Sequence, residues 1–288
     1  MTAIDPVAQE WRDRFMAICS AIIDDSTEPE QTPIVLQSGG MDSMTITAAL
    51  LALGHRPRLV SFRLGGIDYP DLYRVERIAK RHGLELDVVA IERRERVLVA
   101  DIRRALAAGA TNKTHIQCWQ PVDAMAGHIA ELYGPSIVWM GTGGIYDDSR
   151  GIAVERGKHG EDAARVMRAR TLVRGGHEGS ATAFMHKALV DHGHVVAEPY
   201  ATEPFRSYSL GLDIAEICRP RQKGIALRAF PEFYNGAHLW ARNSSLQVGA
   251  GIREWHDTLL DSPRYNPEGF ARIIAVYRRI NNVADRHV

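Results

Sequence analysis

Residues 33–43 read Pro33-Ile34-Val35-Leu36-Gln37-Ser38-Gly39-Gly40-Met41-Asp42-Ser43. The apolar start predicts a short buried strand, and the pair of glycines predicts a tight turn at its end. Apolar residues at helical spacing follow from Met44 to Leu53, and Gly54 closes them. A strand, a glycine turn and a helix bring free backbone N–H groups and the positive end of the helix to one point. The stretch therefore predicts an anion-binding loop.

The side chains of this turn suit a phosphate and a metal ion. Gly39 and Gly40 let the backbone approach an anion where a Cβ atom would collide with it. Ser38 and Ser43 add hydroxyl donors, whereas the carboxylate of Asp42 would repel a phosphate unless a cation lay between them. We therefore expect Asp42 to bind Mg²⁺. The alternative is a structural turn whose serine and aspartate only cap the helix that follows.

The run Ser38-Gly39-Gly40-Met41-Asp42-Ser43 resembles the pyrophosphate-binding loop of the ATP pyrophosphatase (PP-loop) superfamily, whose signature is Ser-Gly-Gly-x-Asp-Ser. A Walker loop is excluded because no Gly-Lys-Ser/Thr follows, and the Gly-x-Gly-x-x-Gly of a Rossmann fingerprint is absent here. The resemblance implies an α/β fold with a parallel sheet, of the adenine nucleotide alpha hydrolase-like type, and it implies ATP and Mg²⁺ as ligands. It also implies that adenine lies against the backbone around Leu36, Phe62 and Met140-Gly141.

Length and composition narrow the class of protein. The 288 residues suffice for one large α/β domain or two modest ones, and 45% apolar with 24% charged residues is ordinary for a globular protein. A formal net charge of zero does not favour non-specific binding to nucleic acid. The cysteines Cys19, Cys118 and Cys218 lie far apart, which argues against a zinc knuckle or a disulfide framework. Without a signal peptide or an apolar run of roughly 20 residues, a cytoplasmic protein is expected.

Strands and helices are expected to alternate over the first half of the chain. A helix of alternating apolar and polar residues is expected over 6–24, and the strand that ends at Leu36 comes next. Further strands are expected at 58–62, 84–91 and 136–140, and helices at 69–82, 97–108 and 121–133. This order predicts βαβ units around a parallel sheet, with the loops after the strands along one ligand-binding edge.

The sequence divides into an N-terminal helix and linker at 1–30, a PP-loop nucleotide-binding core at 31–150, and two further regions. Residues 151–181 are rich in glycine and arginine and have room for a short helix at 161–170. They predict either a lid that orders over phosphates or a solvated connection. Residues 182–288 are predicted to form a helical C-terminal layer. Its helices are expected at 184–189, 210–217, 224–230, 252–260 and 267–281.

A second stretch with chemical content follows the strand expected at 136–140. It reads Gly141-Thr142-Gly143-Gly144-Ile145-Tyr146-Asp147-Asp148. If this strand neighbours the first one, its glycines and carboxylates lie beside the phosphate loop, where Asp147 or Asp148 would bind Mg²⁺ together with Asp42. Otherwise the stretch is a glycine-rich surface turn followed by a polar loop.

The C-terminal region resembles one branch of the superfamily, the asparagine synthetases. The matching residues are Glu203-Pro204-Phe205, Leu210, Asp213-Ile214-Ala215, Lys223, Leu227-Arg228-Ala229-Phe230, Arg242 and Gln247-Val248-Gly249-Ala250-Gly251-Ile252. The resemblance covers roughly residues 30–260 in patches, and it implies that Lys223 reaches the reacting centre. There an ammonium would stabilise negative charge that builds up at the α-phosphate in the transition state. A surface lysine near a helix start is the alternative.

At some positions this sequence differs from the motifs of the asparagine synthetases. Its second acidic motif, Gly-x-Gly-Ser-Asp-Glu, has its acids two residues earlier than Asp147 and Asp148, so either of these could meet the metal. Arg206 and Ser207 stand where the family has Leu-Asp after Pro-Phe. The chain begins Met1-Thr2 and reaches the loop within 40 residues, so we expect no glutaminase domain and no catalytic cysteine at position two. Ammonia would then come from solution or from a separate ammonia-supplying protein.

These features predict an ATP-dependent amide-forming ligase. It would adenylate a substrate carboxylate, release pyrophosphate and transfer the acyl group to ammonia or an amine, with Lys223 and Asp42 as the catalytic residues. Its partners would be small molecules rather than a membrane, and a homo-oligomer stays open. Two other interpretations remain: a nucleic-acid-modifying PP-loop enzyme that uses the basic segment 150–174, and a nucleotide-binding protein without catalysis.

Overall fold

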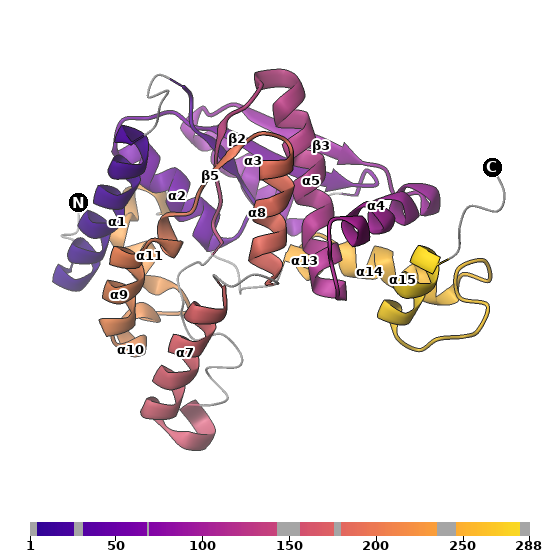
Figure 1. Ribbon diagram of the computed structural model, residues 1–288. Coiled ribbons are helices and arrows are strands. Elements are labelled where there is room, and N and C mark those ends of the chain that lie inside the picture. Colours follow the sequence, from indigo (N-terminus) through magenta and orange to yellow (C-terminus); the bar gives the residue numbers. More distant parts are fainter. Residues whose placement is uncertain are drawn as a thin grey trace.

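A parallel β-sheet lies at the centre of the protein. The computed structural model describes residues 5–25, 31–67, 69–142, 156–175, 180–234 and 246–282. Within these residues the sheet has five strands in the order β3-β2-β1-β4-β5, and every neighbouring pair is parallel. Figure 1 labels β2, β3 and β5 of this sheet, with α5 (Lys113–Tyr133) and α8 (Ala181–Asp191) lying over one face. The strands are β1 (Ile34–Leu36), β2 (Arg58–Leu64), β3 (Leu86–Ile91), β4 (Ile137–Trp139) and β5 (Val195–Ala197). The predicted α/β class with a parallel sheet is confirmed.

The first strand occupies the middle of the sheet. Val35 pairs with Leu59 of β2 on one side and with Trp139 of β4 on the other. The chain builds outward from β1 through β2 to β3, and then returns to the other side of β1 to form β4 and β5. The loop after β1 therefore lies where the strand order reverses, which is the usual ligand-binding position in open parallel sheets.

Helices cover both faces of the sheet, because alternate strand residues point to opposite sides. Ile34, Leu36 and Val60 belong to the core that faces one group of helices, whereas Val35 and Leu59 belong to the core on the other face. The first group is α4 (Glu95–Ala107), α5 (Lys113–Tyr133), α8 (Ala181–Asp191), α14 (Ile252–Asp257) and α15 (Ile273–Asn282). The second group is α1 (Pro6–Asp24), α2 (Met41–Ala52), α3 (Pro70–His82), α9 (Glu203–Gly211), α10 (Ile214–Ile217), α11 (Gly224–Ala229) and α12 (Pro231–Tyr234).

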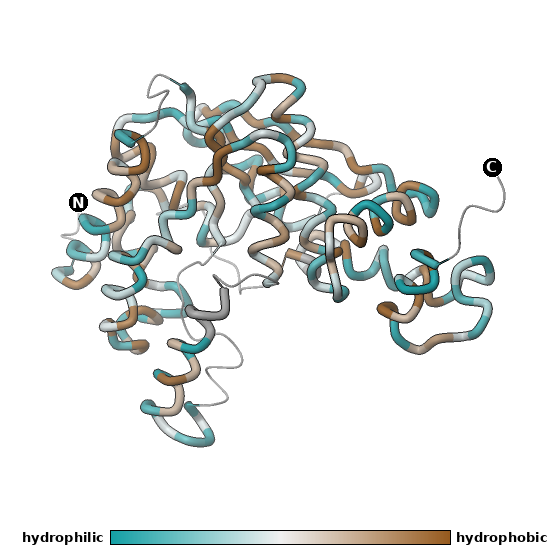
Figure 2. Tube along the Cα trace, viewed as in Figure 1, coloured by the Kyte–Doolittle hydropathy of each residue, from teal (hydrophilic) through white to brown (hydrophobic). Residues whose placement is uncertain are grey.

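The hydropathy of the chain follows this layering. Figure 2 shows apolar residues along the strands and on helix faces, whereas the loop that leads into α15 is mostly hydrophilic. Within the described part of the chain, no helix combines the length and the apolar character needed to cross a bilayer.

Several helices begin or end away from their predicted bounds. α5 begins already at Lys113, because Asn112 caps it by accepting hydrogen bonds from the backbone N–H groups of Thr114 and His115 at 2.9 and 3.0 Å. The prediction started this helix at Pro121, because Met125, Ile129 and Leu132 share one helical face. In the structure Pro121 is a buried residue inside the helix, where packing outweighs the loss of its N–H.

The C-terminal region is mostly helical as predicted, but its helices are shorter, and it also contributes the unpredicted strand β5 to the sheet. The helix expected over 210–217 is two helices, since α9 ends at Gly211 and Asp213 caps α10 through Ala215 N at 2.8 Å. The segment 252–260 is α14 followed by a 3₁₀ turn, Thr258–Asp261. Only the second part of 267–281 is helical. A second 3₁₀ turn (Pro199–Ala201) and α13 (Leu246–Gly249) complete this region.

The basic segment contains α7 (Glu161–Gly175), which is longer than the short helix predicted there. Arg168 is fully buried and donates hydrogen bonds to the carbonyl oxygens of Ser209 at 2.7 Å and Leu212 at 3.2 Å. This side chain therefore ties α7 to the end of α9. Whether the segment closes over a ligand stays a prediction, and residues 143–155 and 176–179 lie outside the described residues.

An aromatic cluster joins the N-terminal helix to the C-terminal region. The ring of Phe205 lies 5.5 Å from Trp11, 5.2 Å from Phe15 and 5.7 Å from Tyr200, measured between ring centroids. All four side chains are buried, so the cluster combines apolar burial with edge-to-face ring contacts.

We predict that Phe205→Ala lowers the free energy of unfolding by about 3–5 kcal/mol, because truncation leaves a cavity between three rings. Phe270→Ala is the control, since Phe270 is 37% exposed and its loss should change stability by less than about 1 kcal/mol. Urea unfolding of both variants measures the difference. An equal loss of unfolding free energy in the two variants would contradict the burial of Phe205 among these rings.

A buried polar chain joins the last helices to α5 and α4. His256 is fully buried, with Nδ1 2.5 Å from the hydroxyl of Tyr277 and Nε2 2.9 Å from Gln120 Oε1. Gln120 in turn donates to Asp101 at 2.7 Å. Burial lowers the pKa of His256 to about 3, so the ring is neutral in the folded protein.

Acidification should therefore destabilise the protein through His256. Between the ordinary histidine pKa of 6.5 and the folded value of about 3, the unfolded chain binds a proton that the folded protein excludes. Stability then falls with decreasing pH by up to about 1.4 kcal/mol per pH unit from this group. His256→Gln should flatten the pH dependence over this window relative to the wild type. Denaturant unfolding at a series of pH values measures both slopes.

Candidate functional site

The glycine turn after β1 is held against the start of α3. Gly39 has φ +73°, and a Cβ atom there would lie 2.4 Å from the carbonyl oxygen of Asp71. Arg74 donates a hydrogen bond from Nε to the carbonyl oxygen of Gly39 at 3.0 Å. Both the positive φ and the close approach require glycine at this position. The turn is therefore a fixed part of the fold.

The serines of the turn have partners within the protein. Ser43 is buried, and its hydroxyl contacts Gln37 Oε1 and the carbonyl oxygen of Gly40, the latter at 3.1 Å. The same hydroxyl accepts a hydrogen bond from the backbone N–H of Ser38 at 3.3 Å. Gln37 also donates to Thr47 at 2.9 Å, so one buried amide joins the turn to the first helical turns of α2. Gln37 was not among the predicted site residues.

The glycine turn leads directly into α2. Gly40 is the N-cap residue of this helix, and no side chain of the described residues caps it. The end of β4 packs directly against this turn, since a Cβ atom on Gly141 would lie 2.7 Å from the backbone nitrogen of Ser43. The condition stated for the Gly141-Thr142 stretch, that its strand neighbours β1, is therefore met.

A cavity of about 150 Å³ opens beside the turn. Its lining residues are Leu36, Gln37, Ser38, Asp42, Ser43, Phe62, Val122, Met125, Met140, Gly141, Thr142, Met185 and Leu246. The structure thus brings together most of the predicted nucleotide-binding residues, from three neighbouring strands. Gly39 and Gly40 shape the turn without lining the cavity. The apolar wall formed by Met125 of α5 and Met185 of α8 was missed, since only the tertiary fold brings these helices to the strand ends.

Lys223 comes from the C-terminal region and reaches the phosphate loop. Its Nζ lies 2.5 Å from Oδ2 of Asp42, and the two side chains are 6% and 22% exposed. Tyr200 donates a hydrogen bond to the backbone oxygen of Asp42 at 3.0 Å, and burial keeps this phenol neutral by raising its pKa. Tyr234 contacts Thr45 Oγ1 at 2.8 Å one turn further along α2. The structure therefore brings both predicted catalytic residues, Lys223 and Asp42, to the open end of α2.

The predicted metal site is described only in part. Asp42 carries an ammonium partner, whereas Asp147 and Asp148 lie outside the described residues. Among the described residues no three acidic, histidine or cysteine side chains gather as metal ligands. Glu198, which follows β5, is a further carboxylate near the cavity, because it accepts a hydrogen bond from Thr142. Sequence reasoning missed it, since β5 is too short to show strand periodicity.

One predicted C-terminal motif has a structural explanation. Gly251 has φ +70°, and a Cβ atom there would lie 2.0 Å from the hydroxyl of Tyr69, the N-cap residue of α3. The glycine therefore allows α14 to begin against Tyr69. Leu246, at the start of α13, lines the cavity. Arg242 lies outside the described residues.

A buried histidine, His194, contacts the start of β4. His194 is buried, and its ring lies 3.2 Å from Ser136 N and 2.9 Å from the carbonyl oxygen of Ala126. It therefore joins the start of β4 to α5 and has a structural role.

Comparisons with known proteins leave the family open. No protein-family model matches the chain, and no curated protein matches it in sequence. Among solved structures the chain is similar to NMN synthetase from Francisella tularensis, with 12% sequence identity over 84% of this chain and 100% of the other, and with a TM-score of 0.33. At this TM-score neither function nor residue roles can be transferred.

The close approach of Gly141 to the start of α2 predicts that a larger residue at this position destabilises the protein. Gly141→Ala should lower the free energy of unfolding by about 1–3 kcal/mol, because the new methyl group forces the strand end and the helix start apart. Gly211→Ala is the matched control, since its Cβ would meet no atom within 4 Å, and it should be neutral or slightly stabilising. Urea unfolding distinguishes the two. Gly141→Ala of unchanged stability would contradict the described contact.

Proposed function

We propose that this protein is a PP-loop enzyme, an ATP-dependent ligase that forms an amide from a carboxylate and ammonia or an amine. The observation that carries the proposal is the position of Lys223. An ammonium from the C-terminal region lies 2.5 Å from the carboxylate of Asp42, at the uncapped start of α2 and beside an apolar cavity. This arrangement combines groups suited to phosphate with space suited to an apolar ring.

The residues present fit MgATP. The uncapped N-terminus of α2 is a site for the terminal phosphates, because backbone N–H groups and the helix dipole favour an anion there. The cavity wall of Phe62, Met125 and Met140 suits an adenine ring. Asp42 would hold Mg²⁺, with Asp147 or Asp148 as further ligands. When bound, the metal neutralises phosphate charge, so that Asp42 and the phosphates can lie together.

The proposed reaction has two steps. A carboxylate oxygen of the substrate attacks the α-phosphorus of ATP, the bond to the β-phosphate oxygen breaks, and pyrophosphate leaves. Ammonia or an amine then attacks the acyl carbon, loses a proton and displaces AMP. Lys223 stabilises negative charge at the α-phosphate during the first step, and the loop holds the leaving pyrophosphate. No protein nucleophile is needed.

Pyrophosphate release from MgATP, measured over a panel of carboxylates and amines, tests this proposal. A substrate carboxylate labelled with ¹⁸O should transfer one labelled oxygen to AMP, because the attacking oxygen stays on the phosphorus. Release of ADP and phosphate, or AMP without the label, would contradict adenylation of the carboxylate.

The roles of the charged pair are tested by substitution. Lys223→Met and Asp42→Ala should each lower kcat/KM for pyrophosphate release by about 10²–10³. Both variants should keep the circular dichroism spectrum of the wild type. Lys187→Met is the matched control, since Lys187 forms an exposed pair with Asp191 at 2.7 Å and should leave the rate unchanged. Full activity of Lys223→Met would exclude its catalytic role, and full activity of Asp42→Ala would exclude its role as a metal ligand.

A further inference from the structure

Lys223 lies at the end of a turn with an uncommon backbone conformation. Its φ is +57°, in the left-handed region that a side chain makes unfavourable by roughly 1–2 kcal/mol. The next residue, Gly224, packs so closely that a Cβ atom would lie 2.2 Å from the carbonyl oxygen of Arg219. Gly224 N also donates to Arg221 O at 2.7 Å. Such a conformation persists only where the surroundings hold it.

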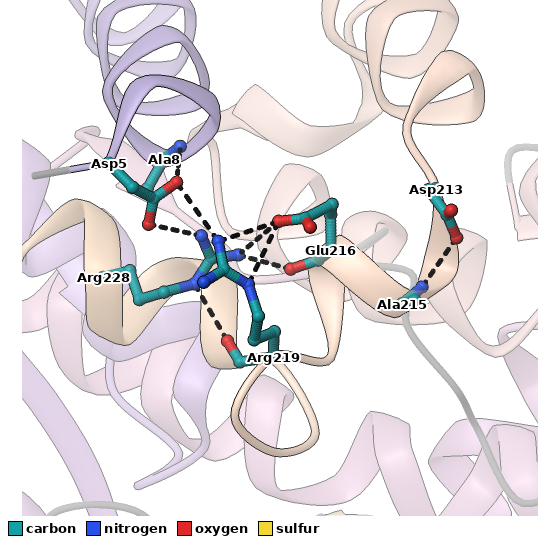
Figure 3. Close-up of polar contacts among 7 residues, drawn as sticks. All are labelled: Asp5, Ala8, Asp213, Ala215, Glu216, Arg219 and Arg228. Atoms are coloured by element: carbon teal, nitrogen blue, oxygen red, sulfur yellow. Dashed lines mark hydrogen bonds and ion pairs between the residues drawn. The ribbon is translucent and has the colours of Figure 1, made fainter.

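Arg228 supplies contacts that hold this turn (Figure 3). Its Nε donates to the carbonyl oxygen of Arg219 at 2.9 Å, and its Nη2 donates to the carbonyl oxygen of Glu216. Its Nη1 donates to Asp5 Oδ2 at 2.5 Å. The planar guanidinium therefore bonds to the turn, to α10 and to the N-cap residue of α1 at once.

The other charges around Arg228 support the same arrangement. Arg219 lies 3.0 Å from Glu216 Oε2 and 3.5 Å from Asp5 Oδ1, so two guanidinium groups and two carboxylates alternate. Asp5 also accepts a hydrogen bond from Ala8 N at 3.1 Å, which fixes its carboxylate on α1. The Arg228 side chain is only 14% exposed, so these contacts are partly shielded from solvent.

We propose that Arg228 is a positioning residue for Lys223. Through Arg219, Glu216 and Asp5 it holds the 219–223 turn in the one shape that keeps the Lys223 ammonium against Asp42 before a substrate binds. The catalytic meaning of this arrangement rests on the proposed function, whereas its geometric part does not. Arg228 itself would touch neither ATP nor the substrates.

Arg12 provides a comparison within the same interface. It also joins α1 to the C-terminal region, with a hydrogen bond to the carbonyl oxygen of Ala229 at 2.8 Å and an ion pair with Glu232 at 2.7 Å. Its side chain is 18% exposed, close to the value for Arg228, and it has no described contact with residues 219–223. Loss of Arg12 should therefore weaken the interface without releasing Lys223.

The experiment measures the reactivity of the Lys223 amine in the full chain. Timed acetylation with a small amine-selective reagent, followed by mass spectrometry of the peptide that contains residue 223, gives its rate relative to the exposed Lys187. In Arg228→Gln we expect this rate to rise roughly tenfold, because charge-assisted hydrogen bonds to the turn are lost. Asp5→Asn should raise it by a few-fold. Arg12→Gln should leave it unchanged at a comparable loss of thermal stability.

Further variants distinguish a role of Arg228 in positioning Lys223 from a general contribution to stability. Arg228→Lys should react like Arg228→Gln, because an ammonium cannot bond in a plane to three acceptors. In assays of pyrophosphate release, Arg228→Gln should lower kcat in the wild-type background and have no effect in the Lys223→Met background. Unchanged Lys223 reactivity in folded Arg228→Gln or folded Asp5→Asn would overturn the inference, and so would an equal rise in Arg12→Gln. A change in reactivity without any pyrophosphate release would overturn the proposed function and leave the positioning role intact.

Discussion

The first turn of α2 is the point at which the separate parts of this structure meet. The end of β4 touches it at Gly141, Tyr200 bonds to the backbone of Asp42, and Tyr234 donates a hydrogen bond to the carbonyl oxygen of Met41 at 3.4 Å. Lys223 adds an ammonium to the same turn. The polar contacts with Asp42 and Met41 come from residues 158 to 193 positions further along the chain, and they converge on this turn. Within the described part of the chain, no side chain caps the N-terminus of α2.

The arrangement also changes how the charge of the loop is balanced. A lone aspartate beside an anion site would repel the anion, but Asp42 already faces a protein cation. In the proposed function, the loop, the carboxylate and the ammonium would form a nearly neutral group, which a phosphate and a metal ion would enter as a pair. The net charge of zero over the whole chain fits a site whose electrostatics are local.

Much of the local structure could be predicted from the residues. Glycines between an apolar run and a helical pattern define the strand, turn and helix around residues 34–52, because their backbone requirements are local. The adjacency of β1 and β4 was left conditional, since it depends on topology. β5 has three residues, which is too few for strand periodicity to appear in the sequence. The start of α5 at Lys113 was missed because the prediction began this helix at Pro121, which lies inside it. The cavity wall on α5 and α8 could not be predicted, because helix packing alone brings it to the strand ends.

The position of α1 sets the order in which the protein can fold during synthesis. Trp11 and Phe15 bury their rings against Phe205, and Asp5 bonds to Arg228, which lies 223 residues further along the chain. The helix is made first, and its packing against α2 involves neighbours made soon after it, but its contacts with Phe205 and Arg228 can form only when most of the chain has left the ribosome. Until then the rings of Trp11 and Phe15 lack the cover that Phe205 gives them. The layer that supports Lys223 is therefore completed last, so a nascent chain forms the Lys223–Asp42 ion pair only after the described strands of the sheet have been made.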